Sequence, residues 1–173
     1  MKKIINTKNL VPDETWQKFR KVRAVIENAE GCFAITIEGG KYIFPGGKCE
    51  ENEDELTAIQ REIKEETGID FQTSEFHKVA ELETMYDDIL DYRTNSIRPR
   101  HTITTYYYVK TNKNINESEM SLTDGEIKEK FKIFFVDRDT LVEMLSKKPS
   151  PEVVNGKMFY EENLFAVDKI LKR

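Results

Sequence analysis

The residues whose types and spacing suit chemistry best are three glutamates in one acidic segment: Glu62, Glu65 and Glu66. Apolar residues recur around them at intervals of three and four, which predicts a helix over residues 53–67. On such a helix the three carboxylates share one side, where they repel one another. A hard divalent cation reverses the sign of that interaction, because Mg²⁺ and Mn²⁺ bind carboxylate oxygens together with substrate phosphates. A solvated acidic helix face explains the same spacing without a metal.

The residues beside these glutamates suit a site for a metal or a phosphate. Gly46 and Gly47 precede the helix and let backbone approach a ligand without side-chain obstruction. Arg61 can orient a neighbouring glutamate through paired hydrogen bonds. Glu53 is expected in the first helical turn, where the helix dipole favours a negative charge. It can also hold Arg61 in position. Gly68 is expected to end the helix as a left-handed cap.

The segment from Gly47 to Ile69 resembles the Nudix box, G-x5-E-x7-R-E-U-x-E-E-x-G-U, where U is a bulky aliphatic residue. All nine specified positions match: Gly47, Glu53, Arg61, Glu62, Ile63, Glu65, Glu66, Gly68 and Ile69. The resemblance implies an α/β/α sandwich with a mixed β-sheet. It also implies hydrolysis of a nucleoside diphosphate linked to another moiety, with water attacking phosphorus. A non-catalytic nucleotide-binding sensor or regulator of the same fold is the alternative, and the intact box favours the enzyme.

The resemblance assigns roles to individual residues. The site for Mg²⁺ or Mn²⁺ is expected from one carbonyl and three carboxylates: Gly47, Glu62, Glu65 and Glu66. Arg61 is expected to hold a catalytic glutamate in place, with Glu65 as the candidate for catalysis within the box. Candidates for contact with substrate in the entry loop are Gly46, Gly47 and Lys48.

The general base is not fixed by the box. In-line displacement places the attacking and leaving oxygens on opposite sides of phosphorus, which favours an acid from a second element. The DGEIKEK loop supplies Glu129, Glu126 and Asp124. Glu129 ranks first because it lies nearest the following strand, although a solvated loop explains all three. A further source is the acidic run Asp87, Asp88 and Asp91.

Substrate recognition has fewer signals. Tyr86 falls 17 residues after Ile69, which resembles a tyrosine position of diadenosine polyphosphate hydrolases in the family. Arg100 is a candidate for binding a second phosphate or a ribose, as are its neighbours Arg93, Arg98 and His101. An exposed loop explains the same charges. In the triplet 106–108 the side chains alternate between faces, so one tyrosine is expected in the core and another is placed to stack a base.

The pattern along the chain predicts one domain over residues 1–173, of α/β class. Strands are expected over 22–27, 31–37, 41–44, 79–85, 102–110 and 132–136. Residues 1–20 are expected to form an N-terminal arm, and residues 86–101 a polar connection. A capping box of Thr140 and Glu143 is expected to open a helix. A C-terminal helix is expected over 157–173.

Composition limits the other function classes. The net charge of −5 disfavours a stable complex with nucleic acid. No apolar run has the length of a signal peptide core or of a membrane span. Cys32 and Cys49 lack metal-site spacing and are expected to be reduced, which favours a cytoplasmic protein. The expected partner is a small nucleotide or another diphosphate, and a homodimer stays open.

Overall fold

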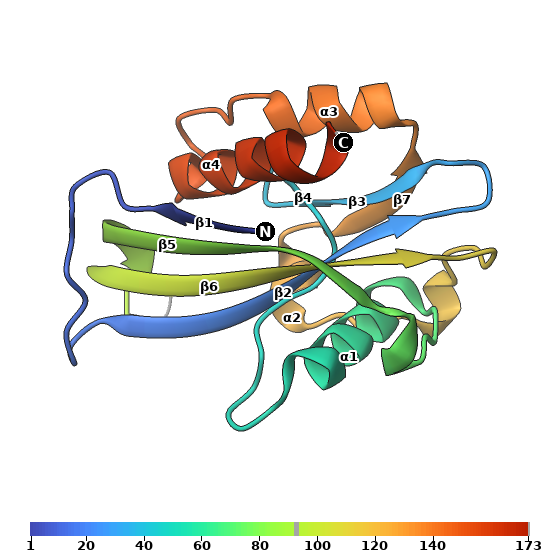
Figure 1. Ribbon diagram of the computed structural model, residues 1–173, viewed down its shortest axis with the longest axis horizontal. Helices are drawn as coiled ribbons and strands as arrows, with labels where there is room; N and C mark the ends of the chain where they lie inside the picture. Colours follow the sequence, from blue (N-terminus) through green and yellow to red (C-terminus); the bar gives the residue numbers. More distant parts are fainter. Residues whose placement is uncertain (92–93, 173) are drawn as a thin grey trace.

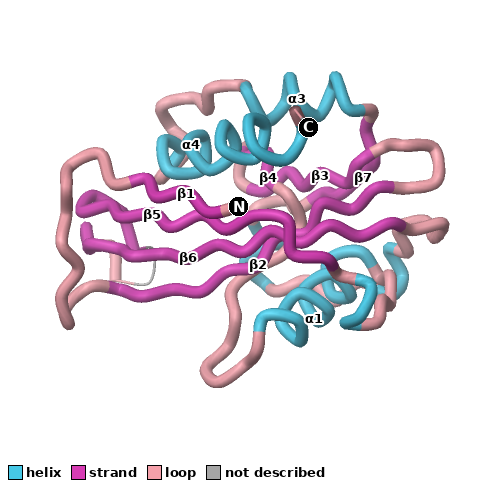
Figure 2. Tube along the Cα trace, in the orientation of Figure 1, coloured by secondary structure: helices cyan, strands magenta, loops and turns pink. Residues whose placement is uncertain are grey.

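The computed structural model describes residues 1–91 and 94–172. Within these residues a seven-stranded sheet lies between helices (Figure 1 and Figure 2). Helices α3 (Arg138–Ser146) and α4 (Gly156–Ala166) cover one side, while α1 (Glu55–Thr67) and α2 (Asp124–Lys128) lie on the other. The expected mixed sheet between helices is confirmed.

The sheet mixes parallel and antiparallel pairs. Its order is β1-β5-β6-β2-β3-β4, with β7 paired to β3. Strands β1 and β5 are parallel, as are β2 and β6, whereas the remaining pairs are antiparallel. The bounds are β1 (Lys2–Ile5), β2 (Gln17–Glu27), β3 (Phe33–Glu38), β4 (Lys41–Ile43), β5 (His77–Asp91), β6 (Ser96–Lys110) and β7 (Lys132–Val136).

Two expectations about connections were wrong. Residues 1–20 are not an arm, because β1 pairs with β5 and β2 already begins at Gln17. The segment 86–101 is not a polar connection either, since β5 continues to Asp91 and β6 starts at Ser96. Its charged side chains stand on an extended hairpin, where alternation lets one face stay polar. Arg93 lies outside the described residues.

The helix starts also differ from expectation. Helix α1 begins at Glu55, because the Asp54 side chain caps it by accepting from the N–H groups of Leu56 and Thr57 at 3.0 Å. Glu53 therefore precedes the helix. The capping box expected at Thr140 was wrong, since Asp137 caps α3 and accepts from the Thr140 N–H.

The other helix ends agree better with the pattern. Gly68 ends α1 at φ 66°, as expected. The expected C-terminal helix is α4 followed by a π-helical turn, Val167–Leu171. Among the described residues, no helix combines the length and apolar character needed to cross a bilayer.

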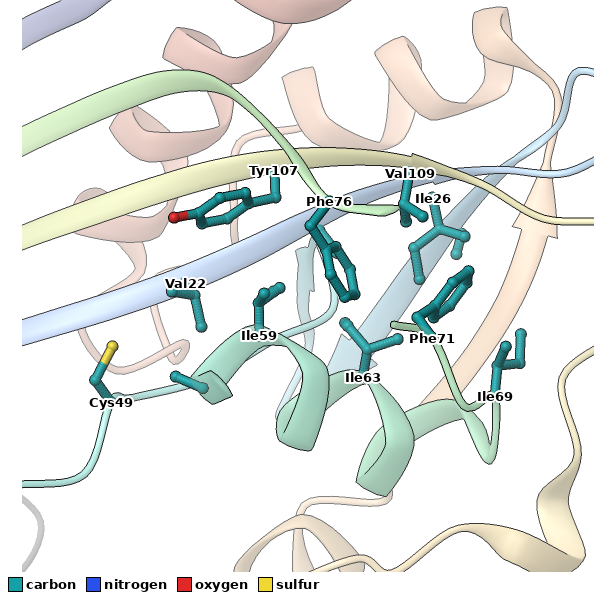
Figure 3. Close-up of a cluster of buried hydrophobic side chains, with 13 residues drawn as sticks. Val22, Ile26, Cys49, Ile59, Ile63, Ile69, Phe71, Phe76, Tyr107 and Val109 are labelled. Atoms are coloured by element: carbon teal, nitrogen blue, oxygen red, sulfur yellow. The ribbon is translucent and has the colours of Figure 1, made fainter. Parts of the chain in front are cut away.

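Two apolar layers hold the sheet between the helices. In Figure 3, Ile59 and Ile63 of α1 point toward Val22, Tyr107 and Val109 on the sheet. Both isoleucines are fully buried, and each contributes about 1.5–3 kcal/mol of hydrophobic stabilisation. The layer under α3 and α4 includes Leu141, Leu145 and Phe165. The first layer fixes the rotation of α1 and thereby the direction of its glutamates.

Candidate active site

The entry loop, residues 45–49, runs along the edge of β2 as if it were a further strand. The Val22 N–H donates to the Gly47 carbonyl at 2.9 Å, and the Ala24 N–H donates to the Pro45 carbonyl at 2.8 Å. Strand β3 pairs with β2 only at Glu27 and Phe33 within the described sheet, so this edge is open to the loop. The loop backbone is therefore rigidly placed.

Gly46 has a conformation and a neighbourhood that favour glycine. Its φ is 121°, and a Cβ there would lie 2.4 Å from the Val22 carbonyl oxygen. Its N–H donates to Oε2 of Glu66 at 2.7 Å, and its carbonyl accepts from the Arg23 guanidinium. The Gly46 backbone thus links Glu66 of α1 to Arg23 of β2 through hydrogen bonds.

Gly47 is required for a different reason. Its φ is not positive, but a Cβ there would lie 2.3 Å from Oε2 of Glu62. The Glu62 carboxylate therefore rests directly against the loop backbone. The two glycines bring two carboxylates of α1 onto adjacent peptide units.

Arg61 organises the remaining carboxylates. It donates from Nε and Nη2 to the two oxygens of Glu53, each at 2.9 Å. Its Nη1 donates to Glu62 at 2.9 Å and to Glu65 at 3.2 Å, while Nη2 also donates to the Lys48 carbonyl at 3.2 Å. The bonds from Arg61 lower the pKa of Glu53. One guanidinium consequently fixes three acids and the loop.

Glu66 is buried and Glu62 is half-buried in the site. Burial raises the pKa of Glu62, against the opposing effect of Arg61. Burial raises the pKa of Glu66 well above its usual range, against the effects of Arg23 and the Gly46 N–H. The carboxylates of Glu62 and Glu126 raise the pKa of Glu66 further. Burial is the main cause of this raised pKa, and the nearby Arg23 opposes it only in part.

Glu126 and Glu129, the acids expected to come from a second element, lie in different surroundings. Glu126, in the first turn of α2, acts electrostatically on Glu66. Its Oε2 accepts from the Thr123 N–H at 2.6 Å and from the Thr123 hydroxyl at 2.7 Å. Glu129 instead pairs with Lys41 at 3.1 Å. Glu126 thus interacts with the carboxylate site, whereas Glu129 is engaged by Lys41, and the identity of the general base stays a prediction.

Other sequence-based candidates are distributed around the sheet. Tyr86 is buried and donates to Glu161 at 2.5 Å, so its hydroxyl is engaged with α4. Asp124 is exposed at the start of α2. Asp87 and Asp88 are exposed and pair with Lys8. The Asp87 and Asp88 side chains are thus engaged by the residues just after β1.

The basic candidates lie toward the start of β6. Arg100 donates to the Gln17 side chain at 3.2 Å, and its guanidinium carbon lies 4.8 Å from the centre of the Phe19 ring. The Lys48 ammonium lies 3.8 Å from the centre of the same ring. His101 contacts Glu83 at 2.9 Å. Lys48 and Arg100 are thus brought together, although they are far apart in sequence.

Sequence reasoning missed Arg23. It is buried within β2, and its Nη1 also donates to the Phe44 carbonyl at 3.2 Å. The signal was a single cation inside the otherwise apolar run VRAVI. A buried guanidinium needs hydrogen-bond acceptors, and here the backbone of the entry loop supplies them.

The acids of this site suit a divalent cation chemically. Among residues 1–91 and 94–172, no three His, Cys, Asp or Glu side chains are gathered closely enough to hold a metal. Arg61 draws Glu62 and Glu65 toward itself in this arrangement. The donor set is nevertheless all oxygen, which hard ions prefer. The residues therefore match the oxygen preference of Mg²⁺ or Mn²⁺ in the chemistry of their donors.

Comparison with known proteins agrees with this geometry. A family model described as NUDIX domain matches residues 18–155. The fold is similar to that of a MutT protein from Methanosarcina mazei Go1, with TM-score 0.55, 18% identity, and 87% of this chain and 96% of that chain covered. The ORF135 protein of E. coli gives TM-score 0.52 and 18% identity, with 91% and 96% covered.

A third similar structure is a MutT protein from Bacillus halodurans, with TM-score 0.53, 18% identity, and 84% of this chain and 82% of that chain covered. At these identities the likeness concerns the fold. No curated protein matches the chain significantly.

Proposed function

The chain belongs to the Nudix hydrolase family, which acts on phosphoric anhydrides, and from this premise we propose that it hydrolyses a nucleoside diphosphate linked to another moiety, using Mg²⁺ or Mn²⁺. One observation carries the proposal: two carboxylates, the half-buried Glu62 and the buried Glu66, lie against the backbone of Gly47 and Gly46. This places acids beside a strand edge that already contains Arg23. A site for the metal cation and a site for phosphate anions would then be adjacent.

The residues of the Nudix box have different proposed roles in binding the metal. Glu62, Glu65 and Glu66 supply oxygens to the metal, and the Gly47 carbonyl retains a lone pair after accepting from Val22. When bound there, such an ion would offset charge on phosphate oxygens and make a water molecule more acidic. Arg61 keeps the carboxylates in position through its fork of hydrogen bonds.

Glu126 is our candidate for the general base. It comes from α2 rather than from α1, so it approaches from a second element. Within the described residues, its hydrogen bonds to Thr123 engage Oε2, which leaves Oε1 for the proton of the attacking water. The bonds to Thr123 also fix its direction, as a base requires.

A phosphate-release screen tests the proposal. Nucleoside triphosphates, nucleotide sugars, ADP-ribose and dinucleoside polyphosphates are incubated with Mg²⁺ or Mn²⁺, with excess chelator as control. We expect metal-dependent turnover of at least one diphosphate. Tight binding of a nucleotide without turnover of any compound would contradict the hydrolase and favour the sensor.

A further inference from the structure

A groove with an excess of basic residues lies beside the entry loop, where β2 and β6 begin (left in Figure 1). Its volume is about 660 Å³, within the range of small-molecule sites. Five basic residues and one acid line it: Lys18, Lys21, Lys48, Arg98, Arg100 and Asp91. The whole chain has 27 basic and 32 acidic residues, so this excess departs from the average.

The groove holds its cations in fixed positions. Lys48 and Arg100 both lie over the ring of Phe19, at 3.8 and 4.8 Å from its centre. Gln17 accepts from Arg100 at 3.2 Å and donates to Asp91 at 2.7 Å. The Asp91 carboxylate also lies 3.9 Å from Nε of Arg98, and the five basic residues of the groove outnumber this one acid.

Lys48 links the groove to the carboxylate site, because it lines the groove and its carbonyl accepts from Arg61. Residues 19, 21 and 23 share one face of β2 because side chains alternate along a strand. Arg23 donates to the Gly46 carbonyl, and the Lys48 carbonyl accepts from Arg61. From Phe19 to Arg23 the strand spans about 13 Å at about 3.3 Å per residue. A ligand bound at Gly46 therefore reaches the groove with a group some 7–13 Å away.

We propose that this groove binds a phosphate group that the substrate carries in addition to its scissile diphosphate. Arginine and lysine are the side chains suited to phosphate, and two of them are held in place by Phe19. The distance along β2 exceeds the length of a diphosphate, which points to a phosphate ester on a sugar. The inference rests on the proposed function and narrows its substrates to nucleotides with such an ester.

Compound pairs that differ by one phosphate ester test this inference, namely NADH with NADPH and dephospho-coenzyme A with coenzyme A. The test variant combines Lys48→Gln with Arg100→Gln, which removes the two cations held over Phe19. The control combines Lys78→Gln with Lys110→Gln, whose side chains are 48% and 69% exposed. Both variants remove the same charge.

Dissociation constants are measured by isothermal titration calorimetry with Mg²⁺ in a Glu65→Gln background, which slows turnover during the titration. We expect the phosphorylated member of a pair to bind about fivefold more tightly at low salt. The groove variant should lower this preference to near one, while the control keeps it. The preference should fade near 1 M salt, where the Debye length is about 3 Å.

Equal binding of both members in every pair, or a preference that survives in the groove variant, would overturn the inference. Hydrolysis by the unmodified chain is measured separately. A preference without hydrolysis of any diphosphate leaves the groove standing and refutes the proposed function. Hydrolysis without such a preference refutes the groove as a phosphate site and leaves the proposed function standing.

Discussion

Replacing Gly47 with alanine separates the position of Glu62 from the stability of the fold. The new Cβ would lie 2.3, 2.5 and 2.6 Å from Oε2, Cδ and Oε1 of the Glu62 carboxylate. Ordinary contacts begin at 3.4 Å, so the carboxylate must move by roughly 1 Å or more. Such a movement also stretches the bond that Arg61 donates to Glu62 at 2.9 Å.

The expected effect falls on the rate. A misplacement of about 1 Å costs on the order of 10²-fold in turnover, or about 2.7 kcal/mol of barrier. Gly47 has no positive φ, so alanine fits its backbone conformation. The loss of folding stability should stay below about 1 kcal/mol, which corresponds to a Tm shift of about 2–4 °C for a chain of this size.

Rates are measured against Mg²⁺ concentration, with thermal unfolding in parallel. Gly125→Ala is the matched control, because its Cβ would meet Thr123 at an ordinary 3.7 Å. Gly46→Ala should lower Tm instead, since φ is 121° and the Val22 carbonyl lies 2.4 Å from the new Cβ. If Gly47→Ala keeps the original rate and Mg²⁺ dependence, the contact with Glu62 has no part in catalysis.

Three further expectations concern the same site. Excess chelator should abolish hydrolysis and Mg²⁺ should restore it, whereas full activity in chelator would refute the metal site. Glu126→Gln should lower kcat about 10²–10⁴-fold and remove the acidic limb of the pH–rate profile. Glu129→Gln should mainly lower Tm, by leaving Lys41 without its carboxylate, and the opposite pattern would restore Glu129 as the base. Arg61→Lys keeps the charge but loses the fork, so Mg²⁺ affinity by calorimetry should fall about 10–100-fold, and an unchanged affinity would contradict its positioning role.

Local patterns predicted those parts of the fold that local interactions decide. Helix α1 follows from Ile59 and Ile63 on its buried face and from the left-handed Gly68 at its end. The pairing of β1 with β5 joins segments almost eighty residues apart, and no periodicity within Lys2–Ile5 reveals it. The hairpin of β5 and β6 was missed because its charged residues are typical of a loop, whereas a strand with one polar face also accepts them.

The same distinction between local and long-range interactions applies to the site. The positions of the box glutamates follow from helix spacing, but the choice between Glu126 and Glu129 depends on which way a five-residue helix faces. Nearness to a strand made Glu129 appear the more rigid. The fold instead turns Glu129 toward Lys41, because Gly39 leaves room for its carboxylate.

Net charge describes the whole chain and not the local groups that a small anion would meet. The chain is acidic overall, at −5, yet the parallel register of β2 and β6 sets Gln17 opposite Arg100 and Lys18 opposite His101. That register collects basic side chains from β2, β6 and the entry loop in one groove. A field of this kind acts over about a Debye length, roughly 8–10 Å at ordinary salt, so nearby groups outweigh the total. On the proposed function, carboxylates beside Gly46 and cations further along β2 would bind the metal and the phosphates of one substrate together.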